Sequence, residues 1–247
     1  MGSAKQNFKA ALWTAGLLGV VLALTQLPVF GVSKVSVTGL GEGCPVTEAE
    51  VRRAAGLPDG ANIFLVNTTA ARRDLLKNPY IGRARVSKKF PSEVLVDLET
   101  RRVRAYVYDS GNFIYIDGDG RVLDVKPNYT EPLPVVRGLK YSSYTKGELL
   151  NVEDSQAFNA VTVTVGLLDF HQLLSDVVYV DVSDLSDISL QTRDYDLILG
   201  DARLLSQRMQ FVRPVLEKQR EKQPGVRGTL DFRSSYRDEV ATFRIMK

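Results

Sequence analysis

The chain of 247 residues is poor in the residues that most often build reactive sites. It has one cysteine, Cys44, and one histidine, His171. A disulfide bond within the chain is therefore excluded, and a zinc site of the usual Cys/His type lacks ligands. Nothing in the neighbouring sequence marks Cys44 as an activated nucleophile, which disfavours a Cys–His catalytic pair.

Catalytic and nucleotide-binding motifs are missing as well. The chain contains no GxGxxG or GxxxxGK[ST] phosphate loop, no HExxH motif and no GxSxG motif. Asp117 and Asp119 could begin a calcium loop, but the glycine spacing and the downstream glutamate are absent, so a turn is favoured. The sequence therefore predicts no enzyme, no cofactor and no metal site.

The chain also lacks a large excess of charge of one sign, because it has 32 basic and 29 acidic residues and a net charge of only +3. This balance gives no general attraction for polyanions and argues against nucleic acid as a partner. One stretch is locally basic, since Arg83, Arg85, Lys88 and Lys89 follow one another closely. A hydrophobic fraction of 44% is typical of a globular chain with one or two domains.

A long uncharged segment lies near the N-terminus, because no charged residue occurs between Lys9 and Lys34. About 20 helical residues cross a hydrocarbon core of about 30 Å, so residues 10–31 are predicted to form a transmembrane helix. A cleaved signal peptide would have a shorter apolar region and a small-x-small site. Lys5 and Lys9 place residues 1–9 in the cytoplasm as a short tail, and the remainder outside.

The next 70 residues predict the order strand, helix, helix, strand, strand. Val35 and Val37 alternate with polar residues, and Thr47 with Glu50 forms a capping box for a first helix. Asn67 or Thr68 caps a second helix, in which Leu75 and Leu76 are expected to face inward.

A strand pair follows, and its side chains alternate between two faces. Arg83, Arg85 and Lys89 are expected on the solvent face, as possible surface contacts. The apolar face is expected to carry Ala84, Val86, Phe90, Val94, Val96 and Leu98.

The second half predicts a mixed domain. Residues 105–125 alternate strongly and contain Asp-Gly turn signals, and residues 176–200 contain successive predicted strands. Residues 155–174 have the length of a helix, and residues 201–223 carry a helical apolar stripe. The fold class is thus α+β, with a single N-terminal transmembrane helix and an antiparallel sheet with flanking helices in the second domain.

Several of these motifs together resemble one family. The stretch NPYIGRARVSKKFPSEVLVDLETR (78–101) is similar to the signature of a POTRA domain in FtsQ/DivIB cell-division proteins. VSKVSVTGL (32–40) and GLPDGANIFLVN (56–67) resemble the first strand and the inter-helix linker of that domain. GNFIYIDGDGRVLDV (111–125) and LPVVRGL (133–139) resemble the start of the family's β domain.

The resemblance implies a POTRA domain over residues 32–102 and a β domain over residues 103–247. It implies a non-enzymatic division scaffold at the septum, held in the lipid bilayer of the cytoplasmic membrane by one helix. The implied partners are FtsB/DivIC-like and FtsL-like single-span proteins, and the implied role is regulation of septal peptidoglycan synthesis. Val103 departs from the family, which often has proline there.

The resemblance also implies that the last strand binds a partner by strand addition. An edge strand offers unpaired backbone groups, and alternate side chains supply specificity. The matching residues here are Glu239, Val240, Ala241, Thr242, Phe243, Arg244 and Ile245.

One alternative interpretation of the last strand and two alternative functions of the chain stay open. The strand could simply close a sheet. The chain could be a POTRA-containing translocation or chaperone module of the cell envelope, although too few residues follow the POTRA region for a large barrel. A membrane-anchored enzyme acting on the cell wall is disfavoured by the missing motifs.

Overall fold

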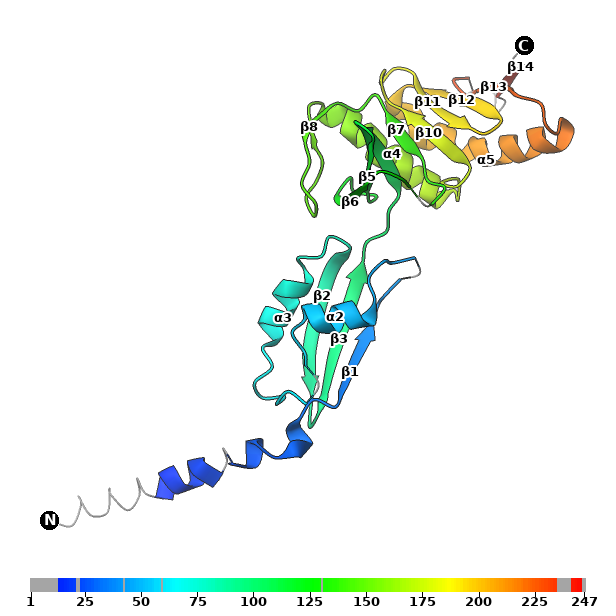
Figure 1. The fold of residues 1–247 in the computed structure, drawn as a ribbon. Coiled ribbons are helices and arrows are strands. Elements are labelled where there is room, and N and C mark those ends of the chain that lie inside the picture. Colours follow the sequence, from blue (N-terminus) through cyan, green and yellow to red (C-terminus); the bar gives the residue numbers. More distant parts are fainter. Residues whose placement is uncertain are drawn as a thin grey trace. The chain divides into compact units, whose positions relative to one another are not determined.

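The chain folds into two units, residues 1–101 and residues 102–247. The structure is a computed structural model that describes residues 13–20, 23–41, 43–58, 60–129, 131–234 and 241–245. Each unit has a β-sheet with helices packed against it (Figure 1).

Unit 1 has the order strand, helix, helix, strand, strand, as predicted. Its central strand, β3, pairs in parallel with β1 and antiparallel with β2. The elements are η1 (Pro28–Phe30), β1 (Lys34–Thr38), α2 (Glu48–Ala54), α3 (Thr68–Leu75), β2 (Ile81–Lys89) and β3 (Glu93–Thr100).

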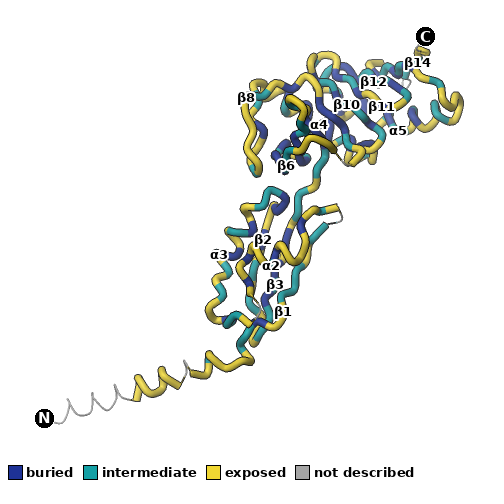
Figure 2. Tube along the Cα trace, viewed as in Figure 1, coloured by how far each residue is buried: buried dark blue, intermediate teal, exposed yellow. Residues whose placement is uncertain are grey.

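Local sequence explains where the two helices begin. Thr47 and Glu50 form the predicted capping box at the start of α2, which supplies partners for backbone N–H groups that the helix leaves free. The Asn67 side chain caps α3 by accepting a hydrogen bond from the Ala70 amide, at 3.0 Å. Both helices lie beside the three-stranded sheet (Figure 2), and Val94 and Val96 of its central strand β3 are fully buried.

Two predicted core positions of unit 1 are wrong. Leu75 is fully buried, but Leu76 is 39% exposed because α3 ends at Leu75 and the chain turns away. Phe90 is 56% exposed, since it lies in the turn after β2 and contacts Phe64 instead of the core.

The predicted transmembrane helix is not shown by the structure. Within the described ranges, no helix has the length and apolar character needed to cross a membrane. Residues 13–20 and 23–25 are helical, and almost all of their side chains are exposed. Residues 10–12, 21 and 22 of the predicted span, and the predicted tail 1–9, lie outside the described residues.

Unit 2 is built on one large sheet and two long helices. The first strands are β4 (Ala105–Asp109), β5 (Asn112–Ile116), β6 (Val122–Lys126), β7 (Val135–Arg137), β8 (Tyr141–Ser143) and β9 (Asn151–Val152). The remaining elements are α4 (Ser155–Phe170), β10 (Val177–Asp181), β11 (Ile188–Thr192), β12 (Tyr195–Gly200), η2 (Ala202–Leu204), α5 (Leu205–Lys222), β13 (Gly228–Asp231) and β14 (Thr242–Ile245).

The large sheet is mixed and not antiparallel as predicted. Among the described residues its nine strands follow the order β14-β13-β12-β11-β10-β7-β4-β5-β6. Three neighbouring pairs are parallel, namely β4 with β7, β7 with β10, and β12 with β13. Each parallel pair is joined through other elements, and α4 and α5 provide two of these crossovers.

Both helices of unit 2 pack on one face of the sheet. The predicted helix over 155–174 is confirmed as α4, which buries Val161, Val165 and Leu168. From α5, Met209 and Val212 enter the same core, which also contains side chains from β4, β10 and β12.

Candidate partner-binding site

Strand β14 lies at one edge of the nine-stranded sheet. It pairs antiparallel with β13, with Thr242 opposite Asp231 and Ile245 opposite Gly228. In the part of the chain that the structure describes, no strand pairs with the other side of β14. In an antiparallel pair, alternate residues direct their N–H and C=O groups away from the partner strand. The outer side of β14 therefore presents backbone donors and acceptors to a further strand.

The predicted site residues take different places at this edge. Thr242, Arg244 and Ile245 are exposed, whereas Phe243 is partly buried and packs against the core of unit 2. Ala241 also packs against that core. Glu239 and Val240 lie outside the described residues.

Two residues that the sequence did not single out hold β14 in place. The rings of Phe243 and Tyr195 meet edge to face, with their centroids 6.2 Å apart. Gly228 lies directly under the strand, because a Cβ atom built there would come within 2.5 Å of the Arg244 carbonyl oxygen. Such a close approach between backbones requires glycine, a requirement that no sequence pattern reveals.

Charged groups contact one another at the end of β13. Arg233 binds Asp231 through its guanidinium, with Nε 3.0 Å from Oδ1 and Nη2 2.6 Å from Oδ2. This hydrogen bonding lowers the pKa of Asp231, and the nearby charge of Arg244 adds to the effect. Buried Arg208 of α5 donates to the Arg233 carbonyl at 3.0 Å and to the Leu199 carbonyl, which ties the helix to the sheet.

The opposite edge of the sheet, β6, is covered. The Val122 amide donates to the Glu148 carbonyl at 2.8 Å, and the Gly147 amide donates to the Val122 carbonyl at 2.7 Å. Lys146 also forms an ion pair with Asp124, at 2.6 Å. Part of the backbone at β6 is therefore already paired, which leaves β14 as the more open edge.

The residues predicted as POTRA surface contacts lie on β2, and each stands near an acidic side chain of the neighbouring strand β3. Arg83 faces Glu99 at 3.4 Å. Lys89 forms an ion pair with Glu93 at 3.0 Å. Arg85 stands opposite Asp97 in the strand register. Acidic side chains of β3 therefore neutralise much of the positive charge of the basic face predicted for β2.

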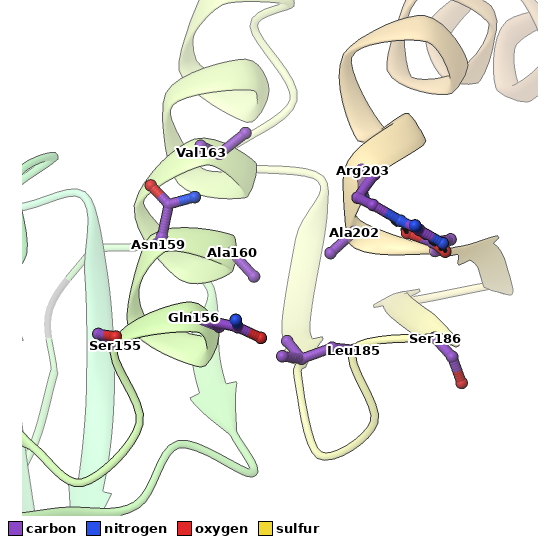
Figure 3. Close-up of a pocket in the computed structure, with 10 residues that line it drawn as sticks. Ser155, Gln156, Asn159, Ala160, Val163, Leu185, Ser186, Ala202 and Arg203 are labelled. Atoms are coloured by element: carbon purple, nitrogen blue, oxygen red, sulfur yellow. Dashed lines mark hydrogen bonds and ion pairs between the residues drawn. The ribbon is translucent and has the colours of Figure 1, made fainter.

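A cavity of about 500 Å³ lies between α4 and η2 (Figure 3). Ala160, Val163 and Ala202 supply apolar walls, and Asp201 also lines the cavity. Hydrogen bonds from Arg203 hold the pKa of Asp201 well below its ordinary value, so this carboxylate is not suited to act as a general base near neutral pH. The described residues contain no group of three or more His, Cys, Asp or Glu that could hold a metal ion.

Comparison with known proteins identifies the fold of unit 1. Residues 30–101 match the family of the POTRA domain, FtsQ-type. Cell division protein DivIB of Clostridium tetani is 24% identical over 165 residues, which are 66% of this chain and 62% of that protein. Cell division protein FtsQ of Corynebacterium glutamicum is 26% identical over 193 residues, covering 76% of this chain and 81% of that protein.

One solved structure is also similar, the major extracytoplasmic domain of the trans isomer of DivIB from Geobacillus stearothermophilus. It is 15% identical with a TM-score of 0.30, and the match covers 45% of this chain and 87% of that domain. The match to the DivIB protein of Clostridium tetani spans less than two thirds of that protein's length.

The fold of unit 1 and the family match show that residues 30–101 form a POTRA domain of the FtsQ type. Over a larger part of its length, the chain is similar in sequence to the DivIB and FtsQ cell division proteins.

Proposed function

We propose that the chain is a non-enzymatic component of the bacterial division machinery. In this proposal residues 10–31 anchor it in the cytoplasmic membrane, with the N-terminus inside and both units outside, at the septum. It binds FtsB/DivIC-like and FtsL-like single-span proteins and thereby helps regulate septal peptidoglycan synthesis. The relationship to DivIB and FtsQ supports the division role.

The observation that carries the proposal is the position of β14. This strand is paired on one side by β13 and is short, polar and exposed on its outer face. A partner segment in extended conformation can add to it, with main-chain hydrogen bonds providing affinity. Exposed Thr242 and Arg244 share one face of the strand and would contact alternate side chains of the partner.

Substitution of proline at Thr242 tests this mechanism. Proline removes a backbone donor and fixes φ, so it disrupts both the pairing with β13 and the addition of a further strand. Loss of one or two hydrogen bonds, at about 1 kcal/mol each, predicts that binding of an FtsB/DivIC-like ectodomain weakens by about fivefold or more. The measurement uses the full chain in detergent or nanodiscs.

Thr242→Val is the matched control. It changes the same side chain but keeps the backbone N–H, so strand addition should tolerate it. Circular dichroism of both variants checks that unit 2 is folded. If Thr242→Pro bound the partner as tightly as the parent chain, β14 would have no part in binding.

A further inference from the structure

Unit 1 exposes a cluster of apolar side chains at the end where β1 begins. The Phe64 ring lies between Phe30 and Phe90, with centroid distances of 5.1 and 5.2 Å. Phe64 is 43% exposed, Phe90 56% and the adjacent Leu65 78%. We call Phe30, Phe64, Leu65 and Phe90 the base cluster. Three large, solvent-facing side chains that touch or adjoin one another form an apolar patch and are not scattered surface residues.

Hydrogen bonds from the backbone and from one side chain join the surroundings of the cluster to the uncharged N-terminal segment. The Ile63 amide donates to the Phe30 carbonyl at 2.8 Å, and the Asn62 side chain donates to the Thr25 carbonyl at 2.7 Å. The Ser33 amide donates to the Ser92 carbonyl at 2.9 Å. The loop before α3 and the turn between β2 and β3 therefore meet the chain where it leaves that segment (Figure 1).

Lysine residues lie next to members of the cluster. The Lys88 ammonium donates to the Phe64 carbonyl at 3.1 Å. Lys34 and Lys89 stand at the adjoining ends of β1 and β2, and both contact Glu93, at 3.4 and 3.0 Å. Among the described residues at this end, the three ammonium groups of Lys34, Lys88 and Lys89 accompany the one carboxylate of Glu93, so these described side chains carry a net positive charge.

We propose that the base cluster inserts into the outer interface of the bilayer, with the lysines contacting anionic headgroups. Aromatic and aliphatic side chains next to lysines are the composition of interfacial membrane contacts. The site directly continues a segment without charge, so its distance from the bilayer is set by a few residues. This inference rests on the proposed membrane anchor and adds that unit 1 itself contacts lipid.

Tryptophan quenching by brominated lipid tests the inference, because Trp13 is the chain's single tryptophan. The parent chain, in nanodiscs of brominated phosphatidylcholine and phosphatidylglycerol, reports the anchor through Trp13. The variant Trp13→Phe with Leu65→Trp reports the base cluster, and Phe90→Trp is a second reporter if the first misfolds. Leu76→Trp in the same background is the control, because Leu76 lies beyond the far end of α3.

We expect strong quenching at Trp13, quenching at the Leu65 reporter several-fold above the control, and a decrease at that reporter in neutral lipid. If Trp13 were quenched and neither the Leu65 nor the Phe90 reporter were quenched, the lipid contact would be overturned while the anchor remained supported. No quenching at Trp13 would overturn the anchor. A blue shift of the Leu65 reporter without quenching would show that protein, such as a second copy of the chain, covers the cluster, and would also overturn the inference.

Discussion

A single methyl group at Gly228 should release β14 from the sheet. The Cβ atom of Gly228→Ala would lie 2.4 Å from the Phe243 ring and 2.5 Å from the Arg244 carbonyl oxygen. The ring could rotate, but the carbonyl belongs to the backbone of β14. Relief of this contact therefore requires the strand itself to move.

The size of the effect follows from the cost of overpacking. Inserting a methyl group into a filled position costs about 1–3 kcal/mol, which corresponds to a change of about 5- to 150-fold in an opening equilibrium. Because β14 is a short edge strand, it opens at less cost than the buried strands beside it. We expect the cost to appear as local opening of residues 242–245 and not as unfolding of unit 2.

Amide hydrogen exchange measures this opening residue by residue. In Gly228→Ala, exchange at residues 242–245 should accelerate, whereas exchange in β11 and β12 should stay unchanged. Gly166→Ala is the matched control, because Gly166 lies exposed in α4 and a Cβ atom there meets nothing within 4 Å. That control should be neutral or stabilising, by up to about 1 kcal/mol. Unchanged exchange at 242–245 in Gly228→Ala would refute the register of Gly228 opposite Ile245.

Two further predictions concern unit 1. Leu75→Ala should lower the free energy of unfolding by about 2–5 kcal/mol, and Leu76→Ala by less than about 0.5 kcal/mol, as measured by urea denaturation; equal losses would contradict their different burial. Hydrogen bonds from Lys89 and Ser36 lower the pKa of Glu93 from 4.5 to about 2. The ionised Glu93 carboxylate therefore stabilises the folded state above pH 4.5, and this contribution is lost as the pH falls from 4.5 toward 2. Glu93→Gln should flatten the pH dependence of the free energy of unfolding over that range. An unaltered slope would argue against these contacts.

Local signals in the sequence predicted the parts of the fold that depend on near neighbours. The capping box of Thr47 and Glu50 and the buried alternation of Val94, Val96 and Leu98 are encoded within a few residues. The inward position of Leu76 was wrong because helix periodicity was continued one residue past the actual end of α3. Periodicity describes an element and does not fix its last residue.

Sheet order could not be predicted, because it depends on pairings between distant segments. The parallel alignment of β12 with β13 requires the whole of α5 between them. The same limit applies to the candidate site. The family resemblance suggested that β14 lies at an edge, but the covering of β6 by residues 147 and 148 depends on contacts that leave no local pattern.

The parallel pairing of β1 with β3 determines how unit 1 would carry tension. The chain enters at the start of β1 and leaves after the end of β3, and the two strands are aligned from Lys34 opposite Glu93 to Thr38 opposite Asp97. A pull applied to these two ends slides the strands past each other and loads all their hydrogen bonds together, because the strands run in the same direction. Neither α2, α3 nor β2 lies on this line of force. Tension on unit 1 would therefore load the β1–β3 hydrogen bonds in shear. The two helices could loosen while the paired strands still held the two ends of the unit together.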